Sequence, residues 1–196
     1  MLIDSHCHLD LPEFEGELSG VLERAKLNRI SHLVTICTKL EEFSSVLEIA
    51  ENTEAVFCSV GVHPHNVDSH KSATKERLID LAEHKSVIGF GETGLDFFYE
   101  RSSRSAQEYS FRTHIKASRS SGLPVIVHTR DAEEKTIAIL EEEFQKGPFT
   151  GVIHCFSAGA SLAEAAVELG LYISISGIIT FKSAEVLRQV VKNIPL

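Results

Sequence analysis

Short apolar runs rich in β-branched residues alternate along the chain with longer segments of mixed apolar and charged residues. A short, mainly apolar run is typical of a strand buried on both faces, as in a parallel sheet. The runs of this kind are residues 2–4, 32–36, 56–62, 87–90, 123–127, 151–153 and 171–175. They predict seven parallel strands.

The segments between these runs have helical spacing. Leu18, Val21, Leu22 and Ala25 recur every three to four positions among charged residues, so they would form one face of a helix. The predicted helices are residues 17–28, 40–52, 73–84, 103–121, 132–145, 161–168 and 184–192. Each strand is followed by a helix, so the chain is predicted to contain seven βα units.

Two α/β architectures are built from such units, the closed (β/α)8 barrel and the open doubly wound sheet. A barrel uses eight strands and about 250 residues, whereas this chain has 196 residues. The barrel is still favoured, because no G-x-G-x-x-G motif follows the first strand and polar residues follow nearly every strand. We predict one α/β domain over residues 1–196, a TIM (β/α)8-type barrel that is incomplete at its C-terminus and lacks the eighth strand.

The composition limits which surfaces the domain can bind and in which compartment we expect it. With 28 acidic and 19 basic residues the formal charge is −9, so no broad basic surface is available for non-specific binding of DNA. The longest mainly apolar stretch, residues 171–181, is too short to span a bilayer, and the acidic N-terminal segment does not resemble a signal peptide. The four cysteines form no C-x-x-C pair. We therefore expect reduced thiols, a cytoplasmic location, no membrane association and no obligate protein partner.

The first candidate site is the segment D-S-H-C-H-L-D at residues 4–10. Side chains two positions apart on an extended chain point the same way, so His6 and His8 can offer imidazoles to one metal ion. Two ordinary polar loop histidines are the alternative, because an H-x-H motif alone is only modestly informative. Its position at the end of the first predicted strand strengthens the metal interpretation.

Four further residues end or follow other predicted strands. Glu92 lies among glycines, where its two oxygens could bridge two cations, although a solvated acid in a turn is the simpler alternative. His128 and His154 each end an apolar run, and either one alone could equally be a satisfied core histidine. His63, in G-V-H-P-H, could instead lie in an exposed turn that contains proline.

These strand ends together favour one site. The carboxyl ends of barrel strands meet at one mouth, where barrel enzymes place their active sites. Residues that follow strands one, four, five and six would therefore point into a single cavity. We expect the ligating atoms of neighbouring residues to lie within ~5 Å of one another.

Several longer motifs occur in a fixed order over essentially the whole chain: D-S-H-C-H-L-D, G-V-H-P-H, G-E-T-G-L-D-F, P-V-I-V-H-T-R-D-A and G-V-I-H-C-F-S. With these motifs the sequence resembles the TatD-type metal-dependent deoxyribonuclease family. The resemblance implies a metal-dependent hydrolase on a (β/α)8 barrel. It also implies hydrolysis of DNA phosphodiester bonds, often from the 3′ end.

The resemblance assigns a role to each matching residue. His6 and His8 would bind one metal ion, Glu92 would bridge two, and His128 with His154 would bind the second. Glu92, His128 and His154 are then the catalytic residues. In the family an Asp in an E-T-D motif on the last strand completes the first site, and this sequence ends before such a motif. The first site is therefore expected to bind its ion more weakly than the second.

Two divalent ions ~3.5 to 4 Å apart can activate a water and stabilise charge on phosphoryl oxygens. The resemblance favours Mg²⁺, with Mn²⁺ or Zn²⁺ as alternatives, because imidazoles and a carboxylate suit several metals. Such ions would make the site positive, which reconciles the acidic composition with a DNA substrate, either single-stranded or at 3′ ends. Arg130, Lys182 and His63 are the candidates for substrate binding, with a solvated loop cation as the alternative for the first two.

Other functions stay open at this point. A small-molecule amide or ester hydrolase could use the same histidines on the same barrel. A truncated barrel could instead bind nucleic acid without turnover. A barrel open between strands one and seven exposes two sheet edges, so we expect either that the native chain continues past Leu196 or that it self-associates.

Overall fold

The computed structural model describes residues 2–70 and 72–195. Those residues form one sheet of seven parallel strands, which pair in the same order as they occur in the chain. The strands are β1 (Leu2–Cys7), β2 (Ile30–Thr35), β3 (Val56–Val60), β4 (Val87–Asp96), β5 (Val125–Arg130), β6 (Gly151–Ile153) and β7 (Tyr172–Ile173). Sequential parallel pairing is the topology of a (β/α) barrel, so the predicted fold class is confirmed.

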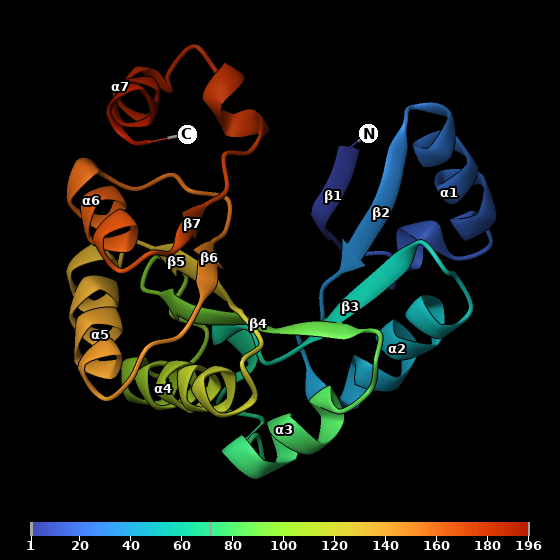
Figure 1. Ribbon diagram of the computed structural model, residues 1–196, viewed down its shortest axis with the longest axis horizontal. Coiled ribbons are helices and arrows are strands. Elements are labelled where there is room, and N and C mark those ends of the chain that lie inside the picture. Colours follow the sequence, from blue (N-terminus) through green and yellow to red (C-terminus); the bar gives the residue numbers. More distant parts are fainter. Residues whose placement is uncertain (1, 71, 196) are drawn as a thin grey trace.

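Helices connect the strands and cover the outer face of the sheet (Figure 1). In the described part of the chain the α-helices are α1 (Leu18–Leu27), α2 (Phe43–Glu51), α3 (Lys75–Ala82), α4 (Arg104–Ser121), α5 (Glu133–Gln145), α6 (Ala160–Glu168) and α7 (Glu185–Asn193). Short 3₁₀ turns are η1 (Pro12–Phe14), η2 (Leu40–Glu42), η3 (Pro64–Asn66) and η4 (Gly177–Thr180). None of the described helices has the length and apolar character that crossing a membrane demands.

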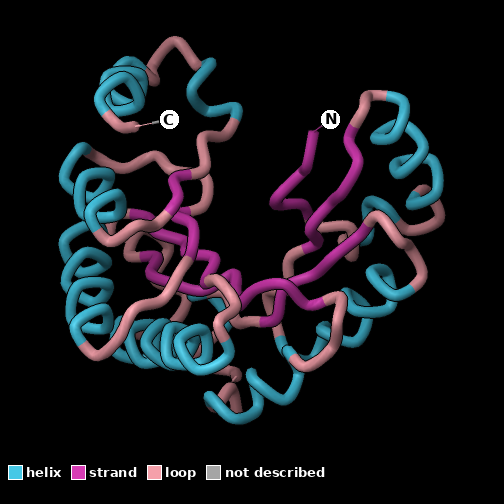
Figure 2. The backbone as a smooth tube through the Cα atoms, in the orientation of Figure 1, coloured by secondary structure: helices cyan, strands magenta, loops and turns pink. Residues whose placement is uncertain are grey.

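The sheet curls strongly but does not close. Figure 2 shows β1 and β7 at the two ends of the curl, with an opening between them, and within the described residues these two strands do not pair with each other. The outer edges of both strands are therefore unpaired there. Whether the native chain continues past Leu196 or self-associates at these edges stays a prediction.

The apolar core lies between the helices and the sheet. Periodic apolar positions of the helices are buried against the strands, as Leu78 of α3 and Ile139 of α5 show. One cluster includes Leu78 and Phe90 in the N-terminal half, and another includes Phe111 and Ile139 in the C-terminal half. This packing holds the strands in register, and with them the side chains at their carboxyl ends.

The largest departure from the predicted elements is β4, which continues six residues past Phe90 to Asp96. The sequence leaves a turn open as the alternative for the glycines of this segment, but Gly94 lies inside the strand with φ +135°. A Cβ at this position would collide with the carbonyl oxygen of His128 on β5, so only glycine allows the two strands to approach. Glu92 consequently belongs to a buried strand and not to a turn.

Candidate metal centre at the carboxyl ends of the strands

Histidines of the first strand meet a carboxylate of the fourth strand. His6 Nε2 lies 3.3 Å from Glu92 Oε2, and one ligating atom each of His6, His8 and Glu92 lies within 4.8 Å of the others. Both ring nitrogens of His6 are buried and have no hydrogen-bond partner in the described part of the chain. Buried polar atoms are normally satisfied, so a metal ion fits this donor set.

Glu92 is the central residue of the site. Its side chain is buried, and Oε1 lies 3.0 Å from His128 Nδ1 and 3.9 Å from His63 Nε2. Burial alone would raise the pKa of this carboxyl group, but the contacts with His128 and His6 outweigh it and hold the pKa well below its usual range. Glu92 is thus a carboxylate with histidines on both sides.

A second set of ligating atoms shares Glu92. One atom each of His63, Glu92 and His128 lies within 4.8 Å of the others, which is compatible with a second ion. Burial lowers the pKa of His63 to about 4, so its imidazole is neutral, the form that binds a metal. The sequence suggested His63 for substrate binding, which stays a prediction; its position among these ligating atoms is also compatible with a role as a metal ligand.

His154 lies in the same centre, but beside the first set. Its ring is parallel to that of His6, with the ring centroids 3.3 Å apart. Burial and the neighbouring His6 lower the pKa of His154 to about 4, so it too is neutral. The two sets of ligating atoms described above do not include it. The assignment of His154 to the second ion together with His128 therefore stays a prediction.

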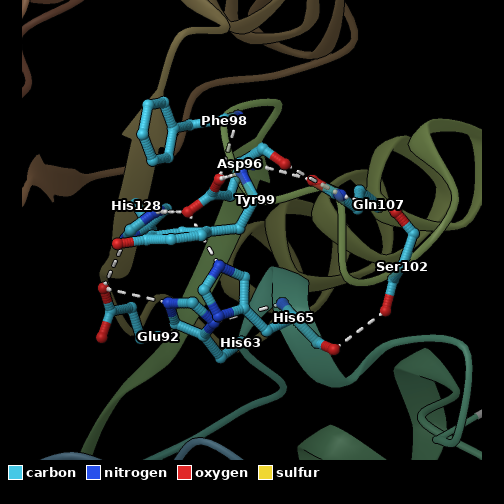
Figure 3. A network of polar contacts seen from close by, with 9 residues as sticks. All are labelled: His63, His65, Glu92, Asp96, Phe98, Tyr99, Ser102, Gln107 and His128. Carbon is cyan, nitrogen blue, oxygen red and sulfur yellow. Dashed lines mark hydrogen bonds and ion pairs between the residues drawn. The ribbon is translucent and has the colours of Figure 1, made fainter.

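Asp96, at the end of β4, holds two of these histidines. Its Oδ2 lies 2.8 Å from His65 Nε2 and 3.1 Å from His128 Nε2 (Figure 3). The main chain of Asp96 is bonded to the buried Gln107, whose Oε1 accepts its N–H at 2.7 Å. Burial opposes ionisation of Asp96, but hydrogen bonds from the Tyr99 N–H and from the two histidines lower its pKa. The carboxylate therefore fixes how His128 faces Glu92.

Two predicted substrate contacts differ in their positions. Arg130 ends β5, and residue pairing between the strands places it beside Asp96. Lys182 follows η4 and is exposed, and no hydrogen bond or ion pair within residues 2–70 and 72–195 connects its ammonium group to the histidines. The structure therefore brings Arg130 next to the centre. In the described residues it shows no contact of the Lys182 ammonium group with the histidines of the centre.

His65 and Gln107 support the centre but were not among the predicted site residues. His65 was visible in the G-V-H-P-H motif, but only the fold shows that it reaches Asp96. Gln107 lies on α4 and carries no motif signal, although its Nε2 donates to the carbonyl oxygens of Asp96 and Ser102. Such supporting contacts depend on the packing of α4 against β4, which periodicity does not specify.

A curled parallel sheet with histidines and carboxylates at the carboxyl ends of its strands defines a barrel protein of the metalloenzyme type. The family model described as TatD related DNase matches residues 3–196. The chain therefore belongs to this family. The resemblance inferred from the sequence motifs is thereby confirmed.

Two relatives of the chain share one name for their chemistry. The chain is 38% identical over 198 residues to YcfH of Escherichia coli K12, and the match covers 100% of this chain and 74% of that protein. It is 31% identical over 195 residues to YabD of Bacillus subtilis, with 100% and 76% covered. Both relatives are named uncharacterized metal-dependent hydrolases.

Solved structures match the fold closely. YjjV, a TatD homologue from Escherichia coli K12, superposes with a TM-score of 0.90 at 31% identity, covering 99% of this chain and 75% of that one. A TatD family hydrolase from Entamoeba histolytica gives a TM-score of 0.83 at 25% identity, covering 99% and 70%. This chain thus spans about three quarters of the length of its relatives.

Proposed function

We propose that the protein is a metal-dependent hydrolase that cleaves phosphodiester bonds of DNA, in single strands or at 3′ ends. The observation that supports this most strongly is Glu92, a buried carboxylate that contacts His6 through one oxygen and His128 through the other. A carboxylate shared by two groups of histidines is suited to bridge two divalent ions, an arrangement common in enzymes that hydrolyse phosphate esters. The family description, TatD related DNase, agrees with this substrate.

The side chains present fit a centre for two ions. His6, His8 and Glu92 would hold one ion, and Glu92 with His128 would hold the other, together with His63 or His154. Mg²⁺ is the proposed metal, with Mn²⁺ or Zn²⁺ as alternatives, because the donor set does not select one. When bound, such ions stabilise negative charge on phosphoryl oxygens and lower the pKa of water.

The residues of the chain have separate tasks in this proposal. Asp96 keeps His128 oriented toward Glu92, and burial keeps His63 neutral and ready to bind a cation. Arg130 is proposed to hold a phosphate of the substrate, because no carboxylate among residues 2–70 and 72–195 lies within 4.0 Å of its guanidinium. Lys182 is proposed as a second, outer phosphate contact.

The proposal includes a cytoplasmic site of action. All four cysteines, Cys7, Cys37, Cys58 and Cys155, are free thiols, the state expected in a reducing compartment. Burial raises the pKa of Cys7 and Cys58 to about 12 and that of Cys37 to about 11, which keeps these thiols protonated and unreactive. Fractionation of cells that produce the protein should recover it with the cytoplasmic markers.

An assay of substrate classes tests the proposal. Labelled single-stranded and nicked DNA are incubated with the protein and Mg²⁺, in parallel with amides and lactones. We expect shortening of the DNA strands from the 3′ end and no comparable turnover of the carbonyl substrates. Turnover of amides or lactones without cleavage of DNA would instead identify a small-molecule hydrolase on the same barrel. Binding of DNA with no turnover of any substrate would identify a non-catalytic barrel.

A further inference from the structure

Two large aromatic side chains lie exposed beside the metal centre. Phe98 and Tyr99 lie just past the end of β4, after Phe97, with 53% and 48% of their surface exposed. The Tyr99 ring meets the ring of His65 edge to face, with the centroids 5.4 Å apart, and His65 in turn contacts Asp96. Figure 3 shows both aromatic side chains with the histidines of the centre. Exposed rings at such a position are available to a substrate.

The segment that carries these rings is held in place by the centre itself. The main-chain N–H groups of Phe98 and Tyr99 donate to Asp96 Oδ1 at 3.1 and 2.8 Å. The N–H of Phe97 donates to the carbonyl oxygen of Arg130 at 2.9 Å. The aromatic rings therefore have a defined position relative to Asp96 and, through it, to His128.

Positive charge surrounds the same rings. The guanidinium carbon of Arg130 lies 4.1 Å from the centroid of the Phe98 ring and 4.7 Å from that of Tyr99, and that of Arg101 lies 5.5 Å from Tyr99. In the described part of the chain neither arginine has a carboxylate within 4.0 Å. Two unpaired arginines on exposed aromatic rings contrast with the overall charge of −9.

This combination matches the chemistry of a single-stranded nucleic acid. Unpaired bases stack on aromatic rings and on guanidinium planes, and arginines bind the phosphates between them. A base inside a duplex is already stacked on both faces and offers no free face to such a platform. An isolated phosphate would need the arginines but not the two exposed rings.

We propose that Phe98, Tyr99 and Arg130 form a platform that stacks an unpaired base of the DNA strand and so places its neighbouring phosphodiester at the metal centre. This inference rests on the proposed function, because the strand end lies at the centre only if the protein hydrolyses DNA. It specifies the contact further: a strand with unpaired bases at its end binds better than a strand that lacks the bases there. Phe98 and Tyr99 act here as positioning residues.

Binding of matched oligonucleotides tests the platform separately from catalysis. One fluorescent oligonucleotide of about ten nucleotides has normal bases, and the other has abasic sites in its last positions at the 3′ end. Both contain phosphorothioate linkages, which resist hydrolysis, and binding is measured by anisotropy in Mg²⁺. We expect the wild-type protein to bind the normal strand about tenfold more tightly or better, as stacking of one base allows.

Variants assign this preference to the platform. Phe98→Leu and Tyr99→Leu keep apolar bulk without an aromatic face, so each should reduce the preference for the normal strand severalfold. Phe98→Tyr and Tyr99→Phe keep the ring and should retain the preference. Tyr109→Leu removes an exposed tyrosine of α4 and is the matched control. Thermal unfolding of each variant shows that it is folded.

The outcomes distinguish the platform from the nuclease activity. Equal affinity of the wild-type protein for the two strands, no binding of either strand, or an unchanged preference in both leucine variants would overturn the platform. Cleavage of ordinary DNA without any base preference would overturn the platform alone. A base preference that depends on the rings, in a protein that does not cleave DNA, would support the platform and overturn the proposed function.

Discussion

His6 Nε2 on β1 lies 3.3 Å from Glu92 Oε2 on β4, so two strands that do not pair with each other contribute to one centre. The curl of the sheet makes this contact, because it turns the carboxyl ends of the strands toward a common mouth. Neither ring nitrogen of His6 has a hydrogen-bond partner within the described residues. The contact therefore places an unsatisfied imidazole beside a carboxylate, and a divalent cation between them would satisfy both.

The affinity for metal should depend most strongly on Glu92. Glu92→Gln removes the negative charge that two sets of histidines share, while the size of the side chain is kept. We expect a loss of Mn²⁺ affinity greater than the roughly 10–100-fold that changes around a ligand produce. Calorimetric titration of the metal-free protein measures this affinity.

The control for this experiment is Glu141→Gln, which changes an exposed glutamate of α5 and should bind Mn²⁺ as the wild type does. Equal Mn²⁺ affinity of the wild type and Glu92→Gln would show that Glu92 is not a ligand. A thermal unfolding curve of Glu92→Gln shows whether the variant is folded.

Asp96→Asn tests the support of His128. The amide keeps the size of the side chain but removes the charge that faces His65 and His128. The pKa of His128 is raised, because Glu92 and Asp96 together outweigh the effect of burial. The variant should therefore show a lower pKa of His128 in an NMR titration of the metal-free protein, and about 10–100-fold weaker Mn²⁺ binding. Asp80→Asn, at an exposed site on α3, is the control, and a pKa of His128 that stays at its wild-type value would contradict the role of Asp96.

The stability of the protein should fall below neutral pH because of His114. This residue of α4 is fully buried; its Nε2 accepts the N–H of Val62 at 3.1 Å, and Nδ1 lies 2.8 Å from the carbonyl oxygen of Ser110. Burial lowers the pKa of His114 from 6.5 to about 4, so the folded protein keeps the ring neutral while the unfolded chain takes up a proton. The contribution of His114 to the free energy of unfolding is complete above about pH 6.5 and decreases by about 1.4 kcal/mol per pH unit as the pH falls toward 4.

Urea denaturation at several pH values measures this effect. His114→Gln does not titrate, so its free energy of unfolding should depend less on pH between about 6.5 and 4 than that of the wild type. The difference between the two proteins isolates His114 from the other titrating groups. Parallel pH profiles for the two proteins would contradict this assignment.

The sequence predicted the seven βα units because each strand lies in a short, mainly apolar run and each helix has an apolar face. It could not predict the true end of β4, since the apolar run ends before Glu92. Residues 91–96 are buried because of the curl of the sheet, although most of them are not apolar. The sequence left a turn open for the glycines in this segment, whereas in the structure Gly94 is required for the close approach of β5.

The site was predictable where a functional residue ends a strand. His6 and Glu92 were found in this way, and the structure brings them together. In the second set of ligating atoms Glu92 and His128 were found in the same way, but His63 was not assigned to an ion, because only the fold shows that its Nε2 points toward Glu92. Phe98 and Tyr99 gave no signal either, since exposed aromatic residues in a loop have no periodicity and acquire meaning only from the neighbouring Arg130.

The dependence of DNA hydrolysis on divalent metal tests the central claim most directly. A 3′-labelled single strand is incubated with the protein in excess chelator, and then after Mg²⁺ or Mn²⁺ is added beyond the chelator. We expect no hydrolysis in the chelator and recovery with either ion, because the proposed nucleophile is a water that a bound cation activates. Hydrolysis that continues at the same rate in excess chelator would contradict a metal-dependent reaction at this centre.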